Sequence, residues 1–136
     1  METLQVIKTG ALSACGIIAS LAVDSMGGYD HFLRTLIFFM AIDFITGWMA
    51  AITVGKLSSR AGFRGFIKKG CMLLIIIVSV FLDELMATNE LVRDAVIIAF
   101  ILNELISILE NAGRMGVKMP DVLRNSLELL SKGKIK

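Results

Sequence analysis

The chain has 136 residues, of which 56% are hydrophobic and 19% charged, and its mean hydropathy is +0.78. Soluble domains contain about 45–50% apolar residues, so this composition excludes an ordinary soluble domain and predicts an all-α integral membrane protein. The net charge of +2 is too small to indicate a nucleic-acid partner.

The first apolar stretch runs from about residue 5 to 23 and has Lys8 near its start. Spanning the hydrocarbon core takes roughly 20 residues, so this stretch spans if Lys8 snorkels to the membrane face. Its short basic start and the small residues Ser20 and Ala22 are also compatible with a cleaved signal peptide, although Glu2 weakens the positive start. We therefore predict three to four transmembrane helices.

The second stretch covers about residues 35–54 and has one carboxylic acid, Asp43, near its centre. An Asp there costs about 2.5–3.5 kcal/mol, which the surrounding Leu, Ile, Phe and Val residues outweigh at about 0.3–0.6 kcal/mol each. A spacing of four places one acid and three small residues on the same helix face: Asp43, Gly47, Ala51 and Gly55. Small residues in such a row let membrane helices pack closely, so we expect Asp43 to face another helix or a lumen.

A basic segment without any acid precedes the third stretch, which covers about residues 70–87. We predict a cytoplasmic loop here, because short loops rich in Lys and Arg stay in the cytoplasm. Its cations, which are also candidates for contact with anionic lipids, are Lys56, Arg60, Arg64, Lys68 and Lys69. The loop charges together predict a cytoplasmic C-terminus and, with four spans, a cytoplasmic N-terminus.

The fourth stretch covers about residues 92–109 and completes a transmembrane region of residues 1–112. Spacings of three and four give it a polar side formed by Asn103, Glu104, Ser107, Glu110 and Asn111, of which we interpret the last two as the interfacial end of the helix. Asp43 and Glu104 both lie near mid-span. We therefore expect these two acids to face each other or to line one polar path.

Residues 113–136 are predicted to form a basic cytoplasmic tail. Pro120 and Asp121 offer a helix start, and the leucines that follow give a short, partly amphipathic helix that is too polar to span. We expect this helix to lie against the inner membrane face or the bundle.

No motif of catalysis or metal binding is present, since the sequence lacks a P-loop, H-E-x-x-H and C-x-x-C. One histidine, His31, makes no metal site, and Cys15 and Cys71 lie in apolar runs and are interpreted as small hydrophobes. We therefore expect no enzyme, no metal and no cofactor.

Two classes of function remain. One is a self-associating membrane protein whose oligomers open a hole, and the other is a small proton-coupled transporter that uses Asp43 or Glu104. Very small transporters often insert in both orientations and avoid a strong Lys and Arg bias. The strong bias of this chain indicates a fixed topology.

Four blocks of the sequence resemble the bacteriophage holin family, which also includes toxin-secretion holins of clostridia. They are DFITG (43–47), GKLSSRAGFRGFIKK (55–69), NELISILEN (103–111) and the proline and leucine at 120 and 123, within a match over about residues 30–125. The resemblance implies a homo-oligomer in the bacterial cytoplasmic membrane that forms lesions. A cell-wall-degrading endolysin, or in toxin loci a toxin, leaves through them as cargo without a specific site on the protein.

The resemblance implies that the following positions match the motifs of the family and are not catalytic: Asp43, Thr46, Gly47, Ser58, Ser59, Gly62, Gly65, Lys68, Lys69, Asn103, Glu104, Ser107, Glu110, Asn111 and Pro120. Our hypothesis is that single copies hide their polar faces from lipid by pairing them, and that these faces turn toward water above a threshold density.

Overall fold

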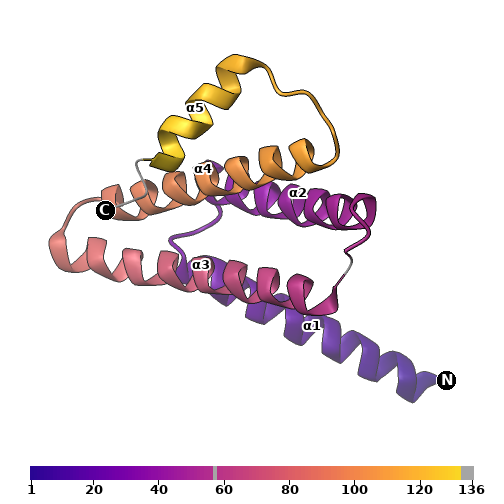
Figure 1. Ribbon diagram of the computed structural model, residues 1–136. Helices are drawn as coiled ribbons and strands as arrows, with labels where there is room; N and C mark the ends of the chain where they lie inside the picture. The colour runs from indigo at the N-terminus through magenta and orange to yellow at the C-terminus, as the bar shows by residue number, and fades with distance from the viewer. Residues whose placement is uncertain (57, 133–136) are drawn as a thin grey trace.

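The computed structural model describes residues 1–56 and 58–132, which form five α-helices (Figure 1). The helices are Glu2–Ser25 (α1), His31–Thr53 (α2), Ser59–Met86 (α3), Leu91–Arg114 (α4) and Asp121–Lys132 (α5). The predicted all-α class is confirmed. Among the described residues three helices, α1, α2 and α3, are long and apolar enough to cross a membrane, so the chain is a multi-pass membrane protein.

Each of the four predicted apolar stretches lies on one helix, to within a residue at its ends. Helix α4 has 24 residues and carries five charges along its length: Arg93, Asp94, Glu104, Glu110 and Arg114. Helix α5 begins at Asp121, as expected. The predicted amphipathic and cytoplasmic character of the tail stays a prediction, and residues 133–136, with Lys134 and Lys136, lie outside the described residues.

Helix α4 packs against both α2 and α3 to form a three-helix bundle, while α1 extends away from it toward the N-terminus (Figure 1). Helices α2 and α4 run in the same direction, as two contacts show. Arg93 near the start of α4 binds Asp30 just before α2, and Asn111 near the end of α4 binds Asp43 farther along α2. The short turn between α3 and α4 makes these two helices antiparallel. No residue of α1 is buried.

The interior of the bundle is mostly apolar in one half, which ends in a polar cluster around Arg93, and polar in the other half. We call the end with the α1–α2 and α3–α4 connections the outer end, and the end with the α2–α3 connection the inner end. The apolar cluster fills the outer half and comprises Met26, Leu33, Leu36, Met40, Met72, Ile76 and Ile97. Lipid is as apolar as these side chains, so close packing rather than exclusion of water holds this half together.

Arg93 clamps the outer end. Its side chain is 1% exposed, and its Nε donates to the carbonyl of Met26 at 2.6 Å. Its Nη1 donates to the carboxylates of Asp30 at 2.6 Å and Asp94 at 3.0 Å, and its Nη2 to the carbonyl of Gly28 at 3.3 Å. The guanidinium therefore ties the α1–α2 connection to α4 with charge-assisted hydrogen bonds.

Two carboxylates at the same end cap helices. Burial would raise the pKa of Asp30, but its hydrogen bonds from Arg93 and from the N–H of Leu33, with the charge of Arg93, hold that pKa below its ordinary value. Asp83 accepts from the N–H groups of Val92 at 3.0 Å and Arg93 at 2.7 Å. The first turn of α4 is thereby satisfied by an acid from the end of α3.

Two adjacent glycines before α2 offer a matched test of the clamp. Gly27 and Gly28 both have a positive φ, of 85° and 91°, so alanine is strained at either position. A Cβ on Gly27 would lie 2.6 Å from Nε of Arg93, whereas a Cβ on Gly28 meets nothing within 4 Å.

We expect Gly28→Ala to cost about 1–2 kcal/mol of stability from backbone strain alone. Gly27→Ala should cost measurably more, because it also displaces the guanidinium. Unfolding of both purified variants in mixed micelles, followed by circular dichroism, measures the difference. Equal losses would show that Arg93 adapts freely and is not held at this position.

The prediction of a basic loop before the third stretch is wrong for most of its residues. Helix α3 begins at Ser59, so Arg60, Arg64, Lys68 and Lys69 are helical and only Lys56 lies in the connection. The segment contains no proline, and cations spaced by four residues suit a helix face as well as a loop. Gly55 also differs from its prediction: α2 ends at Thr53, and Gly55 follows with φ 68° rather than continuing the helical row.

Candidate functional site

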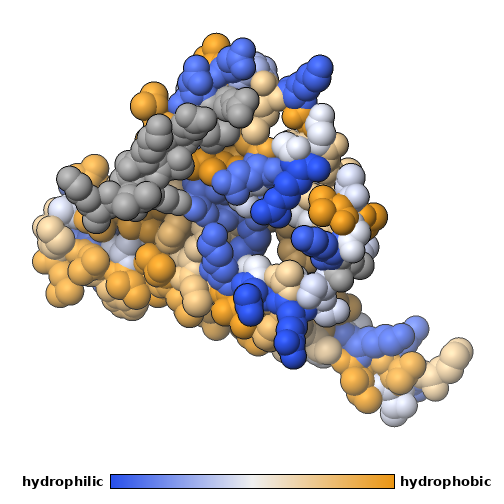
Figure 2. Space-filling view, in the orientation of Figure 1, coloured by the Kyte–Doolittle hydropathy of each residue, from blue (hydrophilic) through white to orange (hydrophobic). Residues whose placement is uncertain are grey.

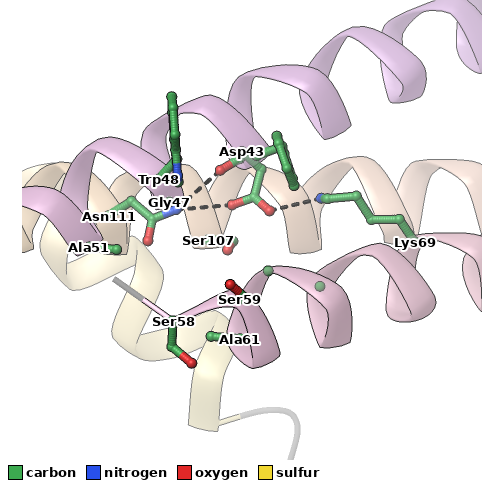
Figure 3. A pocket seen from close by; sticks show the side chains of 13 residues that line it. Asp43, Gly47, Trp48, Ala51, Ser58, Ser59, Ala61, Lys69, Ser107 and Asn111 are labelled. Atoms are coloured by element: carbon green, nitrogen blue, oxygen red, sulfur yellow. Dashed lines mark hydrogen bonds and ion pairs between the residues drawn. The ribbon is translucent and has the colours of Figure 1, made fainter. Parts of the chain in front are cut away.

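A network of charged and polar side chains fills the inner half of the bundle, with Lys69 at its centre. Lys69 comes from α3, and its Nζ donates to Oδ2 of Asp43 on α2 at 2.8 Å and to Oε2 of Glu104 on α4. Figure 3 shows the Lys69 ammonium and the Asn111 amide on either side of the Asp43 carboxylate. One cation thus joins all three helices of the bundle.

Asn111 and Thr46 extend this network toward the inner end. Nδ2 of Asn111 donates to Oδ1 of Asp43 at 3.1 Å and to the hydroxyl of Thr46 at 3.3 Å, while that hydroxyl donates to the carbonyl of Asp43 at 3.1 Å. Gly47 makes room for this contact, since a Cβ there would lie 3.4 Å from the Asn111 amide. Gly47, one helical turn after Asp43, therefore allows α4 to approach α2.

The network is largely shielded within a single copy of the chain. The side chain of Glu104 is 2% exposed, that of Asp43 15% and that of Lys69 16%. Among the described residues no buried side-chain nitrogen or oxygen lacks a hydrogen-bond partner. Charges removed from water are tolerated only when they are paired and hydrogen-bonded in this way. The network therefore holds α2, α3 and α4 together, and the loss of one member would leave its partners buried and unpaired.

A cavity of about 370 Å³ adjoins the network and separates α2 from the first turns of α3. Small side chains line it on both helices, namely Gly47, Ala51, Ala61, Gly62 and Gly65. Asp43, Lys69, Ser107 and Asn111 contribute its polar wall, with Ser58 and Ser59 at the start of α3 (Figure 3). Figure 2 shows hydrophilic side chains gathered on this face between α4 and α3.

The structure brings together most of the candidate residues, and Lys69 links the two acids among them. Asp43, Thr46, Gly47, Ala51, Glu104 and Ser107 lie at the network or its cavity, whereas Gly55 lies beyond the end of α2. Asn103 is half-buried and has an interaction of its own. Asp43 and Glu104 do not bind each other but share Lys69.

Sequence reasoning gave three contributors no part in these polar contacts. It placed Lys69 in a loop and Asn111 at the interfacial end of a helix, although the family resemblance included both, and it did not single out Arg93. Asn111 is in fact 7% exposed and bound to Asp43. Its position four residues after Ser107 and seven after Glu104 was the available signal, because that spacing places it on the buried side of α4.

The profile of the bacteriophage holin family matches residues 20–132, which include α2, α3, α4 and every member of the network. The chain belongs to the bacteriophage holin family. The resemblance seen in the four sequence blocks is thereby confirmed, and membership of this family indicates a non-enzymatic membrane protein.

Relatives of this holin-family chain include a protein called "Probable holin" from Bacillus phage phi105, which is 32% identical over 103 residues, 76% of each chain. The uncharacterized protein Lmo0128 of Listeria monocytogenes is 39% identical over 120 residues, 88% of this chain and 83% of the relative. An uncharacterized 14.9 kDa protein of Clostridium perfringens is 35% identical over 129 residues, 94% and 95% of the two chains. No solved structure matches the chain significantly.

Proposed function

We propose that this protein self-associates in the bacterial cytoplasmic membrane and opens holes through which an endolysin, or in toxin loci a toxin, leaves the cell. Membership of the holin family supports this function, while it gives no support to a proton-coupled transporter. The observation that supports the mechanism is the Lys69 network, a polar interior that is paired within one copy although two of its helices, α2 and α3, are apolar enough to cross a membrane.

The closed state of this mechanism is the single bundle. Asp43 and Glu104 are hidden from lipid because Lys69 binds both. Helix α2 packs mainly on α4 and is separated from the first turns of α3 by the cavity, so α3 is the helix that can move away from α2 at the inner end.

The open state is a ring of copies. When copies accumulate, the polar surfaces of α2, α3 and α4 turn from one another toward a shared water-filled lumen, where their charges are hydrated. The lumen needs no specific site for its cargo. The C-terminus lies in the cytoplasm in this proposal, and so does the N-terminus where four helices span. The bilayer and other copies of the chain are the partners.

Expression in bacteria tests the proposal directly. The protein is induced with and without a co-expressed cytoplasmic endolysin, while growth, membrane potential and escape of the enzyme are followed. We expect abrupt lysis that requires the endolysin and follows a delay set by the expression level. Continued growth without enzyme escape, despite confirmed membrane insertion, would contradict hole formation.

Asp43→Asn is expected to shorten the delay before lysis without preventing insertion. Asparagine keeps the size of the side chain but weakens the bond from Lys69, so the closed bundle loses about 1–3 kcal/mol and opens at a lower density of copies. Asp24→Asn makes the same chemical change at an exposed position and should lyse on the wild-type schedule. Identical schedules at equal membrane levels for wild type and Asp43→Asn would exclude this acid from gating.

A further inference from the structure

The N-terminal half of α3 carries three cations on the same side of the helix. Arg60, Arg64 and Lys68 are spaced by four residues and therefore lie along one side of the helix. All three are exposed, in contrast to Lys69, which points into the bundle. Figure 2 shows hydrophilic side chains over this half of α3 and apolar ones over its other half. We call Arg60, Arg64 and Lys68 the basic stripe.

Among the side chains that the structure describes, no acid pairs with the basic stripe. Within the described part of the chain, salt bridges join acids only to Lys69 and Arg93. The sequence contains no Asp or Glu at all between Asp43 and Asp83. The stripe is therefore an unpaired patch of three positive charges on one helix.

The length of α3 sets the depth of the stripe in the membrane. A helix of 28 residues is about 42 Å long, about 12 Å more than the hydrocarbon core. With Asp83 and Glu84 at the outer boundary, a span of roughly 20 residues that ends at Leu82 begins near Phe63.

The stripe runs from the headgroups into the edge of the hydrocarbon core. Arg60 lies among the headgroups and Arg64 at the boundary, while Lys68 is one turn deeper and reaches the headgroups by snorkelling. Phe63 and Phe66 are exposed by 66% and 69% beside these cations, so two apolar rings are available to lipid next to the stripe. Lys69 lies at a similar depth to Lys68 but finds its anions inside the bundle.

We propose that the basic stripe is a binding site for anionic phospholipids of the inner leaflet, with the lipid phosphates between the guanidinium and ammonium groups. Each cation near an anionic surface contributes about a fivefold preference over zwitterionic lipid. Binding at the stripe does not require hole formation and would hold the first turns of α3 at the membrane surface.

Lipid binding to the full-length protein tests the site. The purified chain in a neutral detergent is titrated with phosphatidylglycerol and with phosphatidylcholine, and bound lipids are counted by native mass spectrometry. We expect tighter binding of phosphatidylglycerol, with a preference that falls about fivefold for each cation removed in R60Q, R60Q/R64Q and R60Q/R64Q/K68Q. R60K/R64K should retain the preference, because it keeps the charges.

The control variant R34Q removes one exposed cation at the outer end of the bundle, as R60Q does within the stripe, and should keep the preference. An equal loss in this control and in R60Q would overturn the site, since it would show a diffuse attraction to the whole protein. No preference for phosphatidylglycerol in the wild type would also overturn it, and would leave the stripe as a surface for an acidic protein segment. Circular dichroism confirms that each variant remains helical.

Discussion

Lys69→Met is expected to destabilise the bundle by about 3–5 kcal/mol, the usual effect of removing one partner of a buried ion pair. The substitution leaves the carboxyl groups of Asp43 and Glu104 inside the bundle without their shared donor. Glu104 is 2% exposed, so its carboxylate would stay buried without a compensating charge. Unfolding in mixed micelles, followed by circular dichroism, measures the loss.

Two further variants make this result specific. Lys68→Met removes the neighbouring lysine, which is exposed, and should change stability by less than about 0.5 kcal/mol. Asp43→Asn/Lys69→Met/Glu104→Gln removes all three charges and should recover most of the loss, because a neutral interior has no unpaired charge to desolvate. Equal stability of wild type and Lys69→Met would show that Lys69 is not paired inside the bundle.

Arg93→Met is expected to cost about 3 kcal/mol and to release the α1–α2 connection from α4. The substitution fills a similar volume but leaves the carbonyls of Met26 and Gly28 and the carboxylate of Asp30 without their donor. Hydrogen exchange of the amides in residues 26–30 should rise, while that of α3 near Lys69 should not. Unchanged exchange in residues 26–30 would contradict the clamp.

The controls for Arg93 are one conservative and one distant change. Arg93→Lys should recover little, since one ammonium cannot reproduce the planar donors of the guanidinium. Arg34→Met, at an exposed position on α2, should stay within about 0.5 kcal/mol of wild type.

The effect of pH on the clamp has a definite sign. Because folding lowers the pKa of Asp30, the clamp stabilises fully above the ordinary carboxyl pKa of 3.8. Its contribution is lost as the pH falls through the lower pKa of the folded state. The stability difference between wild type and Arg93→Met should therefore shrink in that acid range.

The sequence by itself determined the class of protein and the apolar stretch that each of the four long helices contains, but not the first turns of α3. Hydropathy and helical spacing are properties of one segment, so a run of apolar residues predicts a span without knowledge of its neighbours. The same local reasoning placed Asp43 and Glu104 on polar faces directed away from lipid. It also placed Asn111 on the face of Glu104, although it gave Asn111 no partner.

Only the tertiary structure decided which cations enter the bundle. Lys68 and Lys69 are adjacent and chemically identical, but they point about 100° apart around α3, given 3.6 residues per turn. Which of them faces α2 and α4 depends on the rotation of α3 against its neighbours, and no local pattern encodes that rotation. Lys69 is buried because Asp43 and Glu104 lie opposite it. In the same way, Arg93 is buried because backbone carbonyls of the α1–α2 connection lie opposite its guanidinium.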